Sequence, residues 1–298
     1  MITLKKGYIY SIVSAVLFGT AGIFVKLGHN TGLDSVSLLT VQYIIAVSLM
    51  FLTAVLKDRK KLQVTKKQLL NMAVLGGVGN TFMTIFYYMA FEYLPVAMVT
   101  MLLFTYPIMV FIYSVVFGKQ NINRKKIMAI AAAFLGCVLT LNILSGGFQY
   151  SIKGLIFGLL SAVFYAFMNL YTEKKLDNVD SLSINAYSTL FSLLILILYK
   201  PPKILFTGEI KLEGLLYTTI LAIICEIIPL TLLYEAIYHI GALKVSIISN
   251  LEIPTSIIVS FIFLKEGVSV TQILGAVLIF YAIHLVRQEE TMVSKKAS

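Results

Sequence analysis

Ten long apolar runs separated by short polar segments dominate this sequence and constrain its fold more than any other feature. A bilayer core about 30 Å thick requires roughly 20 apolar residues in a helix, and most of the runs reach that length. Only 13% of the residues are charged, whereas soluble domains have about 25%. The sequence therefore predicts an all-α integral membrane protein with ten transmembrane helices. The runs are 7–27, 35–56, 69–91, 95–117, 127–144, 154–172, 181–199, 215–238, 242–263 and 271–286.

Basic residues are distributed unevenly between the two sides of such a bundle. With ten spans, both termini and every loop from an even-numbered to an odd-numbered span share one side, which holds 18 of the 24 lysines and arginines. Cytoplasmic loops carry an excess of these residues. We therefore expect a multi-pass protein of the cell (inner or plasma) membrane, with both termini cytoplasmic and a short cytoplasmic C-terminal tail. Because the net charge of +10 arises from loops, no nucleic-acid partner is predicted.

The two halves of the chain resemble each other at a nearly fixed offset. Each half contains five predicted spans, and an odd number means that the second copy enters the membrane from the opposite face. We therefore expect residues 1–148 and 149–298 to form two inverted five-helix repeats, an arrangement typical of alternating-access carriers. The matched segments are 6–18 with 153–165, 33–37 with 179–183, 87–91 with 233–237, and 104–120 with 250–266, at offsets of 146 or 147.

Two carboxylates, Glu226 and Glu252, fall near the middle of predicted spans. A charge at the centre of a transmembrane helix costs roughly 2.5–3.5 kcal/mol on insertion scales, so such a residue indicates a functional site by default. Pro254, two residues after Glu252, frees backbone groups at the same depth. Glu252 therefore has an architectural alternative, in which its side chain is hydrogen-bonded to the freed backbone.

Further polar and aromatic residues are placed near these acids by the repeat. Asn80 corresponds to Glu226, and Tyr106 corresponds to Glu252, although Asn and Tyr also join helices in membranes. Aromatic faces beside carboxylates attract ammonium groups through cation–π interactions. We expect Glu235, half a turn around the helix from Glu226, at the inner mouth. The candidate substrate-binding residues are Glu226, Glu252, Asn80, Tyr106, Tyr165, Tyr88, Tyr234 and Asn250.

Three segments resemble the ten-helix EamA-like branch of the drug/metabolite transporter superfamily. They are "FGTAGIFVK" (18–26), "GALKVSIISNLEIP" (241–254) and "FLKEGVSVTQILGAVLI" (263–279), and the likeness extends over about residues 7–286. The chain departs from the family pattern at Ile253, which separates a Glu and a Pro that usually adjoin. The resemblance implies the transport of a small metabolite, very often the export of an amino acid or a related compound.

Signatures of other function classes are missing from the sequence. It has no G-x-x-x-x-G-K-[ST] phosphate loop and no H-E-x-x-H motif, so neither an enzyme nor a cofactor or metal site is predicted. We expect a secondary carrier of a small polar metabolite, with amino acids or related amines as the leading class. The alternative is uptake of a quaternary ammonium compound such as choline, and alternatives of another class are an intramembrane enzyme or a channel. The expected partners are the substrate, a coupled proton and membrane lipid, for a monomer or a homodimer.

Overall fold

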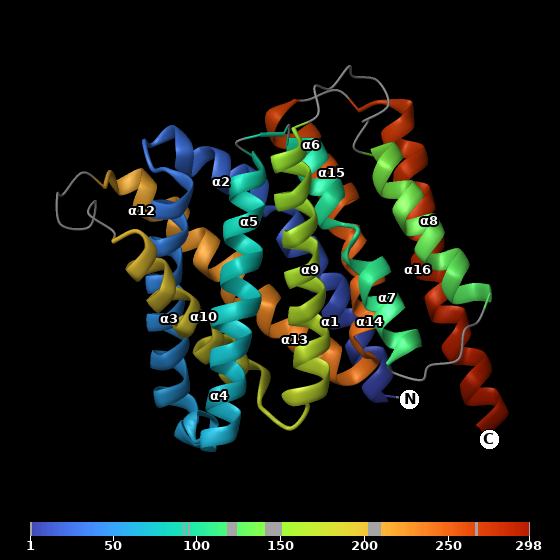
Figure 1. The fold of residues 1–298 in the computed structure, drawn as a ribbon, viewed down its shortest axis with the longest axis horizontal. Helices are drawn as coiled ribbons and strands as arrows, with labels where there is room; N and C mark the ends of the chain where they lie inside the picture. Colours follow the sequence, from blue (N-terminus) through green and yellow to red (C-terminus); the bar gives the residue numbers. More distant parts are fainter. Residues whose placement is uncertain are drawn as a thin grey trace.

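The protein is a bundle of helices, several of them interrupted within the bundle (Figure 1). The computed structural model describes residues 2–91, 93–94, 96–117, 124–140, 151–201, 210–265 and 268–297. All regular elements in these ranges are helical, which confirms the all-α fold class. In chain order they are α1 (Ile2–Gly19), α2 (Ala21–Asn30), α3 (Ser35–Lys57), η1 (Arg59–Leu62), α4 (Lys66–Val74), η2 (Leu75–Asn80), α5 (Thr81–Phe91), α6 (Val96–Leu103), α7 (Tyr106–Val116), α8 (Arg124–Thr140), α9 (Ile152–Lys175), α10 (Ser181–Tyr199), α12 (Leu212–Leu221), η4 (Ala222–Ile227), α13 (Ile228–Ile240), α14 (Ala242–Ile248), η5 (Ser249–Leu251), α15 (Glu252–Leu264) and α16 (Val270–Ala297).

Eight stretches of the described chain are long and apolar enough to cross a membrane. They coincide with eight of the ten predicted runs. The fifth run falls on α8, and residues 141–144 at its end lie outside the described residues. The tenth falls on the first part of α16, where the apolar helix Val270–Val286 is shorter. A multi-pass membrane protein is thus supported, whereas the count of ten spans stays a prediction.

Helices α3 and α10 lie against each other and are tied together at both ends. Asp34 caps the N-terminus of α3 and pairs with Lys200 at 2.9 Å, just after α10 ends. Asp180 caps the N-terminus of α10 and pairs with Lys61 at 2.9 Å, just after α3 ends. The two helices are therefore antiparallel. We name the two ends of the bundle the Asp34 end and the Asp180 end.

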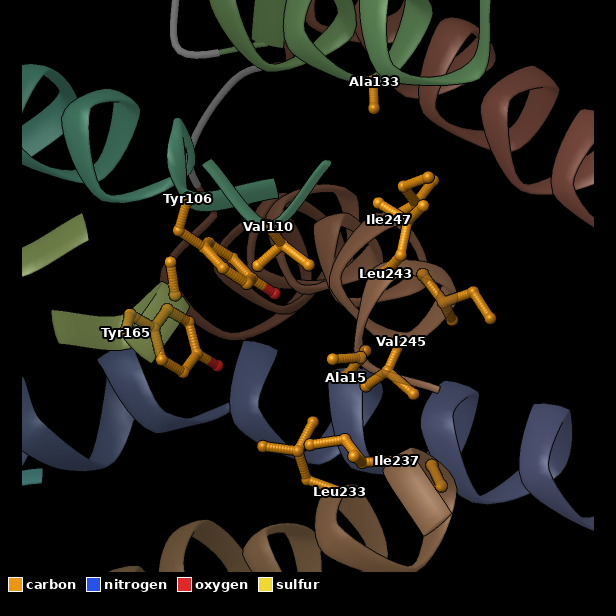
Figure 2. Close-up of a cluster of buried hydrophobic side chains, with 14 of the residues drawn as sticks. Ala15, Tyr106, Val110, Ala133, Tyr165, Leu233, Ile237, Leu243, Val245 and Ile247 are labelled. Carbon is orange, nitrogen blue, oxygen red and sulfur yellow. The ribbon is translucent and has the colours of Figure 1, made fainter. Parts of the chain in front are cut away.

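The two ends of the chain lie at the Asp180 end, where α1 begins and α16 finishes (Figure 1). Helix α1 packs against α13, α14 and α15 with one face, whereas Ile9, Val13 and Val16 on its other face are exposed. Figure 2 shows part of the resulting core, in which Ala15 of α1 faces Leu233 and Ile237 of α13 and Val245 of α14. The core therefore lies on the face of α1 that carries Ala15.

Helices α8 and α16 form a separate pair along one edge of the bundle (Figure 1). They approach closely at two glycines, because a Cβ atom added at Gly136 would lie 2.7 Å from the carbonyl oxygen of Gly275. Small residues at helix contacts are typical of membrane bundles. Ala132 and Gly136, four residues apart on α8, have this small-residue spacing. This pair lies at the edge of the bundle, whereas the candidate site residues gather at its centre.

Candidate functional site

Four of the predicted site residues lie where a helix is interrupted. Asn80 ends the π-helix η2, and Glu226 is the fifth residue of the π-helix η4. Tyr106 is the first residue of α7, and Glu252 is the first residue of α15. A π-helical turn widens the helix and often marks a functional site. The break before Glu252 agrees with the interruption predicted from Pro254.

The interruption at η4 has an identifiable local cause. Pro229 lacks a backbone N–H and follows η4 by two residues, so the regular hydrogen-bond ladder of an α-helix cannot continue through it. Next to this proline, the carbonyl oxygens of Glu226 and Ile227 accept hydrogen bonds from the side-chain amide of Asn185, at 3.1 and 3.2 Å. A buried carbonyl group without such a donor would be costly. Asn185, on α10, therefore stabilises this widened turn.

The other π-helix, η2, is also supported by α10. The Gly76 carbonyl oxygen accepts from the hydroxyl groups of Ser192, at 3.0 Å, and Thr81, at 2.8 Å. Gly76 also packs tightly against α10, since a Cβ atom added there would lie 2.0 Å from the carbonyl oxygen of Ser188. One face of α10 thus supplies donors to both π-helices. We name Ser181, Asn185, Ser188 and Ser192 the α10 polar stripe; all four are buried.

The Glu226 carboxylate is buried, with 6% of the residue exposed. Its Oε1 lies 2.9 Å from the hydroxyl group of Thr189, which also lies 3.0 Å from Oδ1 of Asn185. When Glu226 is ionised, its Oε1 and the Asn185 Oδ1 are both acceptors, whereas the Thr189 hydroxyl group between them has only one proton to donate. A protonated Glu226 could instead donate to Thr189, which would then donate to Asn185. The arrangement therefore accommodates the carboxyl group in both charge states.

Glu252 occupies a different environment, among tyrosines. Burial is the main influence of the surroundings on its carboxyl group, and the architectural alternative stays a prediction. Tyr87, Tyr106 and Tyr165 lie close enough to interact electrostatically with this carboxylate. Glu252 thus has aromatic neighbours around its carboxyl group.

Tyr106 and Tyr165 form the closest aromatic pair of this site. Their ring centroids are 4.2 Å apart, and the Tyr106 hydroxyl group donates to the carbonyl oxygen of Ser246 at 3.2 Å. Figure 2 shows the two rings next to each other, with both hydroxyl oxygens on the same side. This pair brings α7 and α9 together beside the start of α15.

A third tyrosine, Tyr234, lies near Glu226 and near Tyr165. Its hydroxyl group is beside the side chains of Ser188 and Asn80 without a well-formed hydrogen bond to any described residue. It interacts electrostatically with Glu226 on one side and with Tyr165 on the other. The tyrosines therefore connect the surroundings of Glu226 with those of Glu252. We name the cluster of Glu226, Glu252, Asn80, Tyr106, Tyr165 and Tyr234 the central site.

The remaining predicted residues have different positions. Asn250 is buried and donates to the carbonyl oxygens of Ser246 and Ile247 in its own helix, and its Oδ1 has no partner among the described residues. The side chain of Tyr88 lies outside the described residues. Glu235 lies at the Asp180 end, where it accepts from Ser181 at 2.6 Å. It therefore lies at the Asp180 end of the bundle, and that this end is the inner mouth stays a prediction.

Sequence reasoning missed several polar residues of the site. Asn185 and Thr189 contact Glu226 directly, and Asn169 is fully buried beside Tyr165 with its Oδ1 unpaired among the described residues. The α10 polar stripe could have been recognised, because its members recur every three or four residues and so share one helix face. Tyr87 had no signal separating it from other tyrosines.

Comparison with known proteins identifies the family. The sequence profile of the EamA-like transporter family matches residues 5–142 and matches again over residues 152–288. The chain belongs to the EamA-like transporter family. It is therefore a member of the drug/metabolite transporter superfamily, and the predicted resemblance is confirmed. The family supports a membrane transporter as the general function.

Relatives of this EamA-like protein are named as transporters too. An uncharacterized transporter of Bacillus subtilis, YcbK, is 23% identical over 97% of this chain and 95% of its own. An uncharacterized transporter of Clostridium kluyveri is 22% identical over 93% of this chain and 91% of its own. A solved crystal structure covers 99% of both chains with a TM-score of 0.80 at 15% identity. That likeness supports the fold alone.

Proposed function

We propose that this EamA-like protein is a secondary carrier that moves a small polar metabolite, an amino acid or a related amine, across a bacterial-type inner membrane. Ten helices arranged as two inverted repeats would expose the central site alternately to the two sides. Both termini would be cytoplasmic, since the Asp180 end carries most of the basic residues. The single observation that carries the proposal is the placement of two mid-span carboxylates, Glu226 and Glu252, at interrupted helices.

Corresponding interruptions in the two halves support the inverted repeat. The π-helices η2 and η4 both contain six residues and begin 147 residues apart, at Leu75 and Ala222. Helices α7 and α15 begin 146 residues apart, at Tyr106 and Glu252. The family profile itself matches the chain twice at the same spacing. Discontinuous helices near the midplane form substrate sites in many carriers built from inverted repeats.

The substrate class follows from the charge and chemistry of the central site. It contains two carboxylates, and none of its members is basic. Burial of an uncompensated carboxylate is expensive, so an ammonium group of the substrate, or a proton, would compensate it. The proposed substrate therefore carries at least one amino group, and its other polar atoms would be served by Asn80 and the tyrosine hydroxyl groups.

A quaternary ammonium compound such as choline is the second candidate. The observation that favours it is the close pair of Tyr106 and Tyr165 beside Glu252. Aromatic faces attract a cation that has no N–H groups to donate, at about 0.5–2 kcal/mol for each contact. A primary amine would instead need hydrogen-bond acceptors, which the carboxylates provide. The two candidates therefore differ in their dependence on aromatic faces.

A thermal-shift screen of the purified protein against amino acids, amines and quaternary ammonium compounds tests the proposal. A ligand at 100 times its Kd adds about 2.7 kcal/mol of stability, which a melting curve resolves. We expect an amine or amino acid to raise the melting temperature. We also expect Glu226→Gln to lower its affinity by about tenfold or more, or about 1.4 kcal/mol. No response from any of these compounds would contradict the substrate class.

The same variant distinguishes a charge partner from a proton carrier. If Glu226 carries a coupled proton, Glu226→Gln should preserve counterflow exchange while pH-driven accumulation is lost. The geometry at Thr189, which suits both charge states of Glu226, makes this second result informative. A well-folded Glu226→Gln protein with unchanged affinity and unchanged pH-driven transport would remove Glu226 from the site.

A further inference from the structure

The C-terminal end of α9 is joined by hydrogen bonds to three other helices at the Asp180 end. The Tyr171 hydroxyl group donates to Oδ1 of Asn71, on α4, at 3.0 Å, and the Asn71 amide donates to the carbonyl oxygen of Lys175 at 3.3 Å. Lys174 donates to the hydroxyl group of Tyr113, on α7, at 3.1 Å, and its Nζ lies 4.3 Å from the centre of that ring. One end of α9 thus holds both α4 and α7.

The third helix joined to this end of α9 is α14. The Glu173 carboxylate accepts a hydrogen bond from the backbone N–H of Ala242, the first residue of α14, at 3.2 Å. The backbone approaches this carboxylate closely, because a Cβ atom added at Gly241 would lie 2.8 Å from Oε1 of Glu173. We name Tyr171, Glu173, Lys174 and Lys175 the α9 latch.

Each helix that the α9 latch contacts leads to the central site. Helix α4 continues directly into η2, which ends at Asn80. Helix α7 begins at Tyr106, and α14 is followed by η5 and by α15, which begins at Glu252. Helix α9 itself carries Tyr165. A displacement of the end of α9 relative to these helices would therefore rearrange the central site.

The space between the α9 latch and the central site is closed in this structure. Glu173 of the latch and Tyr234 of the central site line the same gap, together with the apolar side chains of Ile184 and Ile237. The gap measures about 10 Å³, which is about the space of one water molecule. An amine or an amino acid cannot pass through it, so these residues close the site on the Asp180 side.

The contacts of the α9 latch are partly open to water. Lys174 and Lys175 are exposed, and Tyr171 and Glu173 are half-buried. Water can replace the hydrogen bonds of such groups, so each bond contributes little net stability. Segments with solvent-exposed hydrogen bonds and little buried apolar surface are also those that open locally. The latch can therefore be released more easily than a contact of the core.

Two of the latch contacts are confined to one end of the bundle. At the positions 147 residues earlier, on α2 at the Asp34 end, Phe24 stands in place of Tyr171 and Leu27 in place of Lys174. Neither side chain has a hydrogen-bond donor, and Phe24 packs in an apolar cluster that includes Leu38. The bonds that join α9 to α4 and α7 therefore have no equivalent from these two positions of α2.

We propose that the α9 latch is the gate on the Asp180 side of the central site. It holds this side closed in the present structure, and its hydrogen bonds break when the site opens towards the Asp180 end. The inference rests on the proposed function, since a carrier must expose its site to each side in turn. The latch suits this role because it joins the helix that carries Tyr165 to the helices that lead to Asn80, Tyr106 and Glu252.

Thiol labelling of membrane vesicles tests the gate without knowledge of the substrate. Cys137 and Cys225, both buried, are first replaced by alanine and serine, respectively. Ser188→Cys, a small change at a fully buried position beside Tyr234, then reports access to the central site. An impermeant methanethiosulfonate reagent is added to right-side-out and to inside-out vesicles, and a cysteine at Lys60 shows which preparation exposes the Asp180 end.

The latch variant is compared with a control that carries the same chemical changes. Tyr171→Phe with Lys174→Met removes the hydroxyl and ammonium groups that reach α4 and α7. The control, Tyr187→Phe with Lys61→Met, removes two contacts at the same end that join η1 to α10 and to its capping residue. These control contacts lie within the α3–α10 pair, which is tied at its other end as well.

Ser188→Cys should react slowly from the Asp180 face in the parent and about fivefold or more faster in the latch variant, because loss of bonds made only in the closed state raises the population of the open state. The control should stay within about twofold of the parent, since contacts that are equal in both states shift no equilibrium. An unchanged rate in the latch variant, or an equal rise in the control, would refute the gate.

A purely structural role of the latch predicts a different result, which is a lower melting temperature with an unchanged labelling rate. Tyr171→Phe alone removes a single hydroxyl group and replaces the double variant if that one does not fold; its rate should rise by about twofold or more. Labelling requires no ligand, and the ligand screen requires no labelling. Failure of the gate is therefore distinguishable from failure of the proposed carrier function.

Discussion

The side-chain amide of Asn185 donates to the main-chain carbonyl oxygen of Glu226, at 3.1 Å, across the contact between α10 and η4. The same amide lies 3.2 Å from the Ile227 carbonyl oxygen. These two hydrogen bonds tie the π-helical turn that carries Glu226 to a residue of another helix. The first prediction follows from this contact.

Replacement of Asn185 by alanine should destabilise the protein. The buried carbonyl groups of Glu226 and Ile227 would lose their donor, at a cost of about 1–3 kcal/mol. Asn178→Ala is the matched control, because Asn178 is exposed and its amide contacts only the neighbouring Asp177 among described partners. Thermal unfolding in detergent measures both. Equal melting temperatures for the two variants would show that η4 does not need Asn185.

Gly76→Ala should also destabilise the protein, through steric overlap. The added methyl group would meet the backbone carbonyl oxygen of Ser188 at 2.0 Å, and a backbone atom of a packed helix cannot move away easily. Overpacking of this kind costs about 1–3 kcal/mol. Gly77→Ala is the control, since its nearest neighbour is the end of the flexible Ile195 side chain at 3.2 Å. We expect the Gly77 variant to melt close to the parent and the Gly76 variant well below it.

The ion pair at the Asp34 end predicts a dependence of stability on pH. Burial alone raises the pKa of the Asp34 carboxyl group, but hydrogen bonds from Ser37 and Lys200 outweigh it and lower the pKa to about 2. A carboxyl group with a depressed pKa stabilises the folded state fully above its unfolded value near 4, and this contribution is lost as the pH falls towards 2.

The contribution should be small, at most about 1 kcal/mol, because both partners are largely exposed. Melting temperatures of the parent and of Asp34→Asn, measured from pH 6 to pH 2.5, should converge below about pH 4. A constant difference between them down to pH 2.5 would mean that the carboxylate has no role in capping α3. In a Lys200→Ala background, the difference in melting temperature between the Asp34 protein and its Asp34→Asn variant should be smaller but not zero, since Ser37 still donates to the Asp34 carboxylate.

The orientation in the membrane can be tested by labelling from outside intact cells. The side that includes the Asp180 end holds most of the basic residues, so cysteines at Lys60 and Arg124 should be shielded from an impermeant thiol reagent. A cysteine at Lys211, exposed before α12 at the Asp34 end, should react. A cysteine at Lys203, which lies outside the described residues, is an equivalent probe of this side and should also react. Labelling at Lys60 would reverse the orientation.

The apolar runs predicted most of the helices, because helix length and bilayer thickness are linked by simple geometry. The interruption before Pro254 was also predictable, since proline disrupts the ladder locally. The break between α1 and α2 at Thr20 and the π-helix η2 were not, because no proline accompanies either of them, and η2 is supported by a hydroxyl group of another helix. Local sequence does not encode such contacts.

The sequence predicted how deep in the membrane the candidate site residues lie, but not how their side chains are arranged. Mid-span position identified Glu226 and Glu252 as unusual, and the repeat added Asn80 and Tyr106. Whether two side chains at the same depth touch depends on helix rotation, which the sequence does not specify. The pairing of Tyr106 with Tyr165 and the contact of Thr189 with Glu226 therefore required the structure.

The α10 polar stripe makes the two matched halves of the chain unequal. At an offset of 146, the residues of α3 that correspond to Asn185 and Ser192 are Leu39 and Ala46, which have no side-chain donor. A protein assembled from two copies of the first half would leave both π-helices without their support from a neighbouring helix. One half therefore supplies the donors that reach both π-helices from a neighbouring helix, and exchanging the halves would remove this support.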